Sequence, residues 1–295
     1  MELHIVSASS IAQQFWCEMQ VDLKRHYGAI STKEMEGGKV IHDDLLLEIS
    51  KVRQVKIKTP SDRLHTNLHN ILMGVKQYKN IGLTRELQVF FKFGSVLILC
   101  SVDELRKIDE EGRDSLNRRR KFKKTQMTET KTRTSNRRPS SSQIYRDKIQ
   151  GMIYWYGLNS MMNESMGLEE VYTAFGIDPD AISLSEEYMN SLKIPSESQP
   201  LYDNRFFWDN QIKEIYKEIA KIPKLSDVIK LKYIYQITRE EIHTEEFQFD
   251  PRFFSKKMEW ALDYWLGRRK PISVGERNQW KCNFCNYKEK CPSFG

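Results

Sequence analysis

Two strand-like segments separated by a long charged connection, between residues 93 and 133, constrain the fold most strongly. Residues 96–100 read VLILC, a short apolar run that is typical of a buried strand. Residues 126–133 alternate in polarity and are rich in Thr, which is typical of a half-buried strand. If the two segments pair, they form a hairpin within a sheet, and the charged residues 106–125 connect them at its tip.

Carboxylates on these two segments suggest a metal site. Asp103 follows the apolar run and is expected at the exit of its strand. Glu129 and Lys131 share one face of the second strand, because residues i and i+2 project to the same side. Hard oxygen ligands suit Mg2+ or Mn2+, so Asp103 and Glu129 with Lys131 beside them predict a divalent-metal site. The alternative is a surface hairpin with ordinary charges.

Other polar residues stand at positions that could support such a site. His42 follows the Gly37-Gly38 break on the first turn of an expected helix. Its imidazole is either structural or an extra metal ligand. Gln150 and Tyr154 are four positions apart and share one face of an expected helix. Core packing explains the aromatic residues of that helix but does not explain Gln150.

The rest of the chain alternates between expected helices and strands. A helix is expected within residues 7–28, and residues 51–94 are expected to form a strand, a helix and a second strand. Residues 163–245 are polar and expected to be mostly helical, as in an inserted cap.

Three cysteines near the C-terminus have a metal-binding spacing. Cys282, Cys285 and Cys291 form a C-x2-C-x5-C pattern, which in a reducing compartment indicates a metal or cluster site. Cys100 lies in the expected buried strand, so Cys17, on a helix that could turn it toward the C-terminus, is the better fourth ligand. Four thiolates suit an iron–sulfur cluster, with zinc as the alternative.

The charge of the chain favours a polyanionic partner. Its 295 residues include 47 Lys and Arg against 40 Asp and Glu, a formal net charge of +7. Residues 118–124 are almost continuously positive, as in a solvated tip, a nuclear-import signal or a phosphate-contacting arm. The sequence shows neither a membrane-length apolar run nor a secretory or transit signal at residues 1–10, and we expect an intracellular protein without a membrane partner. No G-x-x-x-x-G-K-[ST] motif is present, which argues against motor activity.

Together these motifs resemble the exonuclease V family, in the RecB-like branch of the PD-(D/E)XK nucleases. The matching residues, in chain order, are Cys17, Gly38 to His42, Asp103 in a D-E-L context, Glu129 with Lys131 and Arg133 in E-x-K-T-R, Arg138-Pro139-Ser140, Gln150 with Tyr154, and Cys282, Cys285 and Cys291. Val102 stands where the family motif has proline, and 25 residues separate Asp103 from Glu129.

The resemblance implies an α/β fold with a restriction-endonuclease-like core, in which a mixed central sheet is flanked by helices. It implies a single RecB-like nuclease domain over residues 1–295. Within it we expect a catalytic core at 37–160 and a helical cap at 163–245. Residues 246–295 with Cys17 form an iron–sulfur module, whose cluster staples the N- and C-terminal segments together.

The resemblance also implies a role for each site residue. The Mg2+ or Mn2+ ligands are His42, Asp103, Glu129 and the carbonyl of Thr130. Lys131 orients or deprotonates the attacking water, or neutralises charge on the phosphate, and Gln150 and Tyr154 position Lys131 or the DNA. The ligands of a 4Fe-4S cluster are Cys17, Cys282, Cys285 and Cys291. The residues expected to contact DNA are Arg119, Arg120, Lys121, Arg133 and Arg138.

The implied activity is hydrolysis of single-stranded DNA from a free end, in DNA repair or genome maintenance. We expect a monomer that works with a single-strand-binding protein, in the nucleus or cytoplasm, with the mitochondrion as a third compartment. Two alternatives remain open: a catalytically inactive iron–sulfur DNA-binding module, and a RecB-like flap or CRISPR-associated nuclease. The intact Asp103, Glu129 and Lys131 argue against the inactive module.

Overall fold

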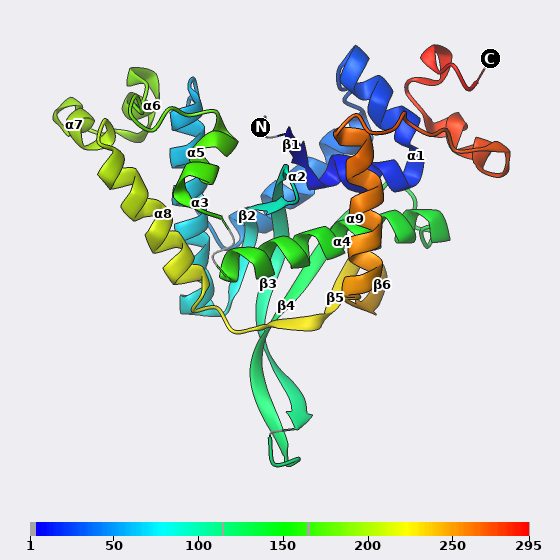
Figure 1. Cartoon of the computed structure of the whole chain (residues 1–295). Coiled ribbons are helices and arrows are strands. Elements are labelled where there is room, and N and C mark those ends of the chain that lie inside the picture. The colour runs from blue at the N-terminus through cyan, green and yellow to red at the C-terminus, as the bar shows by residue number, and fades with distance from the viewer. Residues whose placement is uncertain (1–3, 114, 164–165, 295) are drawn as a thin grey trace. The chain divides into compact units, whose positions relative to one another are not determined.

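The computed structural model describes residues 4–113, 115–163 and 166–294. Its strands form a six-stranded sheet in the order β1-β3-β4-β5-β6, with β2 paired to β3, and helices flank the sheet (Figure 1). The strands are β1 (His4–Ser7), β2 (Leu83–Phe93), β3 (Val96–Arg113), β4 (Arg119–Arg133), β5 (Leu225–Tyr235) and β6 (Glu241–Gln248). The predicted α/β architecture, a central sheet flanked by helices, is confirmed. The assignment to a PD-(D/E)XK core stays a prediction.

The chain divides into two compact units, which interleave along the sequence. Unit 1 comprises Met1–Ile5, Asp44–Met127 and Tyr156–Ser226, and unit 2 comprises Val6–Asp43, Thr128–Trp155 and Asp227–Gly295. Several elements pass from one unit to the other; the helices among them are α2 (Lys33–Leu47) and α4 (Ser141–Met162). The predicted division into core, cap and iron–sulfur module follows different boundaries and stays a prediction.

Helix α3 (Pro60–Ile81) packs on β2 in unit 1. Its start is fixed by a reciprocal capping box between Thr59 and Asp62, and it ends at Gly82, whose φ of 72° closes the helix. Gly74 allows close approach to the sheet, since a Cβ there would lie 2.7 Å from the Leu87 side chain. The buried face repeats at helical spacing and consists of Leu64, Leu68, Ile71 and Val75.

Helices of the predicted cap follow in unit 1: α5 (Leu168–Phe175), α6 (Glu186–Leu192), α7 (Gln199–Tyr202) and α8 (Arg205–Ile219), with a short 3-10 turn, η1 (Ser196–Ser198). The expected helical stretch does not reach residue 245. β5 and β6 occupy its last part, because alternate residues of β5, including Ile229, Leu231 and Tyr233, are buried with the period of a strand.

Residues 51–58, which cover most of the first predicted strand of the 51–94 segment, form neither strand nor helix. They run instead along the end of α6, where the Lys56 amide donates to Ser191 Oγ at 3.4 Å and Arg53 donates to the Leu192 carbonyl at 3.1 Å. Polar alternation predicted a strand wrongly here, because side-chain and helix-end acceptors take the place of a neighbouring strand.

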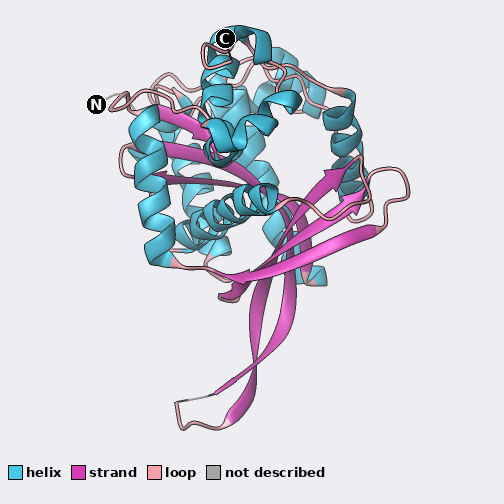
Figure 2. Ribbon diagram, turned by 90° about the vertical axis from the view of Figure 1, so that its right-hand side faces the viewer, coloured by secondary structure: helices cyan, strands magenta, loops and turns pink. Residues whose placement is uncertain are grey.

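The charged connection is not a loop. β3 continues for 18 residues, so Asp103 lies within the strand rather than at its exit. β2 pairs with β3 only as far as Arg106, and beyond that point β3 and β4 form a two-stranded arm, residues 107–124 (Figure 2). Ion pairs hold the two strands together: Lys123 to Asp109 and Lys124 to Glu110, each at 2.6 Å.

Unit 2 contains α1 (Ala8–Tyr27), α9 (Pro251–Trp265) and two 3-10 segments, η2 (Glu276–Phe284) and η3 (Lys288–Lys290). The helix predicted within residues 7–28 is confirmed as α1, which the Ser7 side chain caps. Helical geometry breaks at Cys17, whose φ of −160° and ψ of 111° are extended. Of the helices that the structure describes, none is long and apolar enough to span a membrane.

Candidate active site and cysteine-lined pocket

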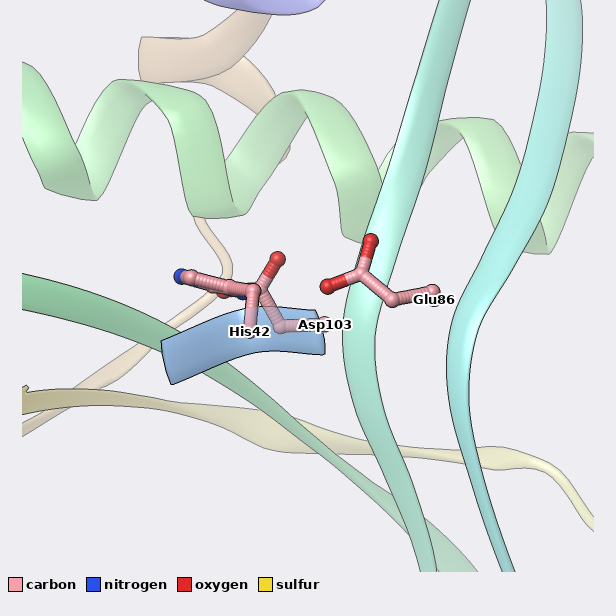
Figure 3. A group of neighbouring side chains, drawn as sticks. All are labelled: His42, Glu86 and Asp103. Carbon is pink, nitrogen blue, oxygen red and sulfur yellow. The ribbon is translucent and has the colours of Figure 1, made fainter. Parts of the chain in front are cut away.

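Two carboxylates face each other across the β2–β3 ladder in unit 1. The pairs Arg85–Glu104 and Leu87–Val102 bracket the positions of Glu86 and Asp103, which are therefore opposite each other. A carboxylate oxygen of Glu86 lies within 4.8 Å of one from Asp103, and Figure 3 shows both side chains. Two half-buried carboxylates this close repel each other unless a proton or a cation lies between them. The pair can therefore hold a divalent cation.

Glu86 has an unusual backbone conformation. Its φ is 53°, a left-handed value that residues other than glycine adopt infrequently. Its carboxylate accepts a hydrogen bond from Ser101 Oγ at 2.9 Å, which fixes the side chain on the Asp103 face of β3. Sequence reasoning missed Glu86. The signal was present in Gly94-Ser95, because a two-residue turn between Phe93 and Val96 sets the register that places Glu86 opposite Asp103.

Unit 2 holds a chain of hydrogen bonds that begins at Glu129. Lys131 Nζ lies 2.6 Å from Glu129 Oε1 and 2.8 Å from Gln150 Oε1, and Gln150 Nε2 donates to Tyr154 Oη at 2.6 Å. The Glu129 side chain is 2 % exposed and that of Lys131 is 21 % exposed. The E-x-K spacing on β4 and the Q-x-x-x-Y spacing on α4 both place their residues on one face. The structure thus brings together four of the predicted catalytic residues.

The remaining predicted metal ligands also belong to unit 2. Thr130 is buried between Glu129 and Lys131, and its side chain projects to the opposite face of β4. His42, the third residue labelled in Figure 3, is half-buried on α2. Their assignment as metal ligands stays a proposal.

The cations predicted to contact DNA fall into two groups. Arg119, Arg120 and Lys121 are exposed on the arm in unit 1. In unit 2, Arg138 is exposed and pairs with Glu245 at 3.5 Å, whereas Arg133 is half-buried. Burial lowers the pKa of the Arg133 guanidinium, and the charge of Asp147 opposes that shift.

The four predicted cluster cysteines line one pocket in unit 2, together with Trp16 and Lys281. The break at Cys17 turns that residue out of regular α1 geometry. Tight turns order the other three, since the amide of Cys285 donates to the Cys282 carbonyl and that of Cys291 to the Lys288 carbonyl, each at 3.2 Å. Cys100, in contrast, lies on β3 in unit 1 and outside this pocket.

The pocket is unfavourable for bare thiolates. The pKa of the Cys17 thiol is raised to about 11, mainly by burial; a hydrogen bond from the Gln20 backbone opposes the shift, and the three neighbouring cysteines add to it. Burial also raises the pKa of Cys285. The raised pKa values mean that ionising the Cys17 and Cys285 thiols costs free energy. A positively charged group bound to the sulfurs would offset that cost, as metal centres do. The donor set therefore fits a thiolate-bound metal or cluster.

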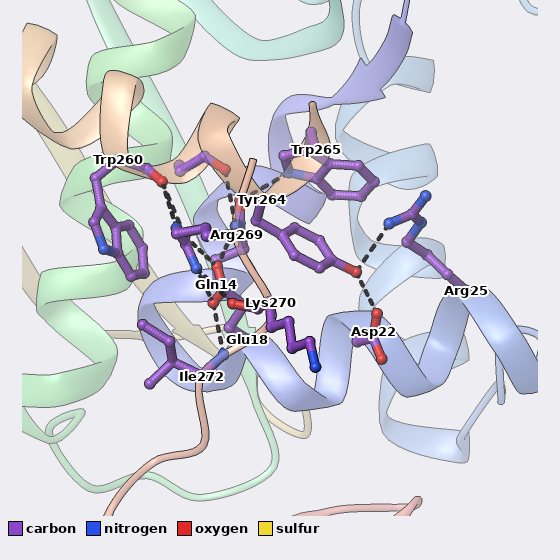
Figure 4. A network of polar contacts seen from close by, with 11 residues as sticks. Gln14, Glu18, Asp22, Arg25, Trp260, Tyr264, Trp265, Arg269, Lys270 and Ile272 are labelled. Carbon is purple, nitrogen blue, oxygen red and sulfur yellow. Dashed lines mark hydrogen bonds and ion pairs between the residues drawn. The ribbon is translucent and has the colours of Figure 1, made fainter. Parts of the chain in front are cut away.

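A polar network ties α1 to α9 beside this pocket (Figure 4). Glu18, next to Cys17, is 1 % exposed and binds Arg269 through both carboxylate oxygens at 2.5 and 2.6 Å. The Ile272 amide donates to the same carboxylate at 2.8 Å. Further along α1, Tyr264 Oη donates to Asp22 at 2.7 Å. The network fixes α1 against α9 and against the chain that leads to the C-terminal cysteines.

The comparisons with known proteins agree with the sequence motifs. A family model described as exonuclease V, a 5′ deoxyribonuclease, matches residues 3–118, 106–205 and 196–292. The chain belongs to the exonuclease V family. It is also similar to exonuclease V of Danio rerio, with 25 % identity over 293 residues that cover 97 % of this chain and 69 % of that protein.

Membership of the exonuclease V family confirms the predicted resemblance and the prediction that the chain is an exodeoxyribonuclease. The family description adds the 5′ end, which the sequence motifs did not predict. The intact Glu129 and Lys131, joined by a short ion pair, agree with a family of enzymes better than with an inactive module.

Proposed function

We propose that this member of the exonuclease V family is a divalent-metal-dependent enzyme that digests single-stranded DNA from the 5′ end, in DNA repair or genome maintenance. The observation that carries the metal dependence is the opposed pair Glu86 and Asp103, whose carboxylate oxygens lie within 4.8 Å. Two carboxylates this close repel each other, and a divalent cation bound between them would relieve that repulsion.

The proposed ligands of Mg2+ or Mn2+ are Glu86 and Asp103 with His42, Glu129 and the Thr130 carbonyl. Glu86 is an addition to the predicted set. Carboxylate and carbonyl oxygens are the ligands that these ions prefer. When bound there, the ion polarises the scissile phosphate and lowers the pKa of the attacking water.

Lys131 supplies the cationic group of the proposed mechanism. Its ammonium is held by Glu129 at 2.6 Å and by Gln150 at 2.8 Å, so it has little freedom to rotate away. From that position it orients the water or neutralises the charge that develops on the phosphate. Tyr154 fixes the Gln150 amide, so these two residues position Lys131 without touching the phosphate.

We propose that the cysteine pocket binds a 4Fe-4S cluster with a structural role, because phosphodiester hydrolysis requires no electron transfer. Zinc remains the alternative. Four thiolates suit a cluster of this kind, and four cysteines line the pocket.

The remaining parts of the proposal concern partners. Arg119, Arg120, Lys121, Arg133 and Arg138 are the proposed phosphate contacts, which would bind with little sequence preference. A single-strand-binding protein as partner, a monomeric state, and a place in the nucleus, the cytoplasm or the mitochondrion stay predictions.

The test uses protein purified without oxygen. Iron and zinc are counted, and single strands labelled at either end are digested with Mg2+ or with EDTA. We expect about four iron atoms per chain, as one cubane cluster requires, and Mg2+-dependent loss of single strands from the 5′ end. Digestion in EDTA would refute the metal proposal. Zinc without iron would be compatible with the proposed nuclease activity but would refute the proposed 4Fe-4S cluster.

A further inference from the structure

The arm concentrates the positive charge of the molecule. Residues 107–124 contain eight Lys and Arg against four Asp and Glu, which is a net charge of +4 out of +7 for the whole chain. These residues lie in unit 1, and β3 has no β2 partner beyond Arg106. The charge therefore lies on a two-stranded ribbon that extends beyond the end of β2 at which Leu83 pairs with Arg106 (Figure 1).

Positive charge is unevenly distributed along the arm. Near the sheet, Lys123 and Lys124 pair with Asp109 and Glu110, and these hydrogen bonds lower the pKa of both carboxylates. Toward the tip the cations are exposed. Among the residues that the structure describes, Arg119 and Lys121 form no ion pair. The arm is thus nearly neutral at its base and cationic at its end.

The cationic end is too far from Asp103 to act on the phosphate that is cut there. Arg113 lies ten positions beyond Asp103 on β3, and a strand rises about 3.3 Å per residue, so the tip lies about 33 Å along the strand. Phosphates along one DNA strand are about 3.4 Å apart, so the tip reaches about ten nucleotides beyond the cut.

The shape of the arm favours duplex over single-stranded nucleic acid. The major groove of B-DNA, about 12 Å wide, admits a two-stranded β-ribbon. Proteins that hold single strands instead offer aromatic rings for base stacking. The aromatic ring of the arm, Phe122, packs over Gly112, where a Cβ would lie 3.1 Å from the ring. The ring is only partly covered by this contact, since Phe122 is 37 % exposed. It is nevertheless the one aromatic residue in the sequence of residues 107–124, where eight residues are Lys or Arg.

We propose that the arm binds the groove of a duplex DNA segment next to the single-stranded end, and so directs the enzyme to junctions between single-stranded and duplex DNA. This inference rests on the proposed single-strand activity for its substrate. It adds a second, non-catalytic DNA-binding surface that contacts phosphates through Arg119, Arg120 and Lys121.

Fluorescence anisotropy in EDTA tests the proposal without hydrolysis. The ligands are a duplex with a 5′ single-stranded tail and the same tail alone, each measured over a series of salt concentrations. The tip variant carries Arg119→Gln, Arg120→Gln and Lys121→Gln. A control with the same loss of charge carries Lys76→Gln, Lys213→Gln and Lys217→Gln, all exposed lysines of unit 1.

For the tip variant we expect weaker binding of the tailed duplex, by about tenfold or more, and a salt slope smaller by about 2 to 3, as three lost phosphate contacts require. Affinity for the tail alone should not change, and the control should match wild type. An equal loss on both ligands would show a single-strand contact and overturn the proposal, as would no loss on either. If the wild-type protein binds the tailed duplex through the arm but does not digest the single strand in Mg2+, the proposed single-strand nuclease activity is refuted instead.

Discussion

Glu86 lies opposite Asp103 in the antiparallel β2–β3 ladder, and a carboxylate oxygen of each comes within 4.8 Å of the other. The arrangement depends on the left-handed backbone of Glu86, with a φ of 53°. Strain of this kind persists where the surrounding structure enforces it, and it is concentrated at functional sites. In this chain the strained residue presents one of two carboxylates suited to a divalent cation.

The substitution Glu86→Gln keeps the size of the side chain and removes its charge. We expect the Mg2+ concentration needed for half-maximal digestion to rise about tenfold or more, because one anionic ligand is lost. A Mg2+ titration of the digestion rate measures this change. Glu111→Gln on the exposed arm is the control with equal charge, and an identical titration curve for the two variants would count against a metal at Glu86.

Tyr154→Phe removes the hydroxyl that accepts a hydrogen bond from the Gln150 side-chain amide. The lost hydrogen bond contributes about 1 kcal/mol to holding Gln150, and through it Lys131, in place. We therefore expect kcat to fall about fivefold. KM should stay constant, because Tyr154 acts through Lys131 and not on the bound substrate. Steady-state digestion of a labelled single strand gives both constants. Tyr27→Phe, at an exposed tyrosine, should leave both unchanged. A change in KM alone would place Tyr154 in substrate binding instead.

The four pocket cysteines and Cys100 should respond differently to substitution. Cys291→Ser removes one proposed ligand from the pocket, and we expect loss of bound metal together with lower thermal stability, since metal binding is coupled to folding. Cys100→Ser, on β3, should retain the full metal content. Metal analysis and thermal unfolding of the two variants provide the comparison. Equal metal content in both would remove Cys291 from the ligand set.

Neighbouring arginines after α9 offer a matched test of the α1–α9 network. Arg269→Ala leaves the buried Glu18 carboxylate without its bidentate partner, which predicts a loss of about 3 to 5 kcal/mol in the free energy of unfolding. Arg268→Ala breaks only an exposed pair with Asp263 and should cost less than about 1 kcal/mol. Urea unfolding of both variants measures the difference, and equal losses would show that the network does not stabilise the protein.

His65 predicts a pH dependence of stability in unit 1. Burial lowers its pKa to about 4, with a further contribution from His69, while an unfolded histidine titrates near about 6.5. Between these values the unfolded chain binds more protons than the folded one, so the free energy of unfolding falls as the pH falls. We expect His65→Gln to show a shallower decline across this window in urea unfolding. Parallel curves for wild type and variant would exclude His65 as the cause.

Local sequence signals predicted much of the site. The E-x-K and Q-x-x-x-Y spacings predicted which of Glu129, Lys131, Gln150 and Tyr154 share a face, because strand and helix periods determine that directly. The C-x2-C-x5-C spacing and the helical position of Cys17 likewise predicted the residues that now line one pocket.

Features that depend on pairing between distant segments were missed. β3 and β4 extend through the charged connection because each supplies hydrogen bonds and ion pairs to the other, which the hydrophobic pattern of either strand alone does not reveal. The bond between Glu18 and Arg269 joins positions 251 residues apart, and no local pattern predicts such a pair. Glu86 could have been found, had the Gly94-Ser95 turn been used to set the strand register.

Mn2+ binding followed by electron paramagnetic resonance, with digestion of a 5′-labelled single strand on the same samples, tests whether the opposed carboxylates form the metal site. The wild-type protein is expected to bind Mn2+ and digest the strand. Asp103→Asn, which keeps the shape of the side chain and removes its charge, is expected to lose both while remaining folded with its cysteine-bound metal. A folded Asp103→Asn protein that binds Mn2+ and digests DNA at the wild-type rate would contradict the assignment of the active site to these residues.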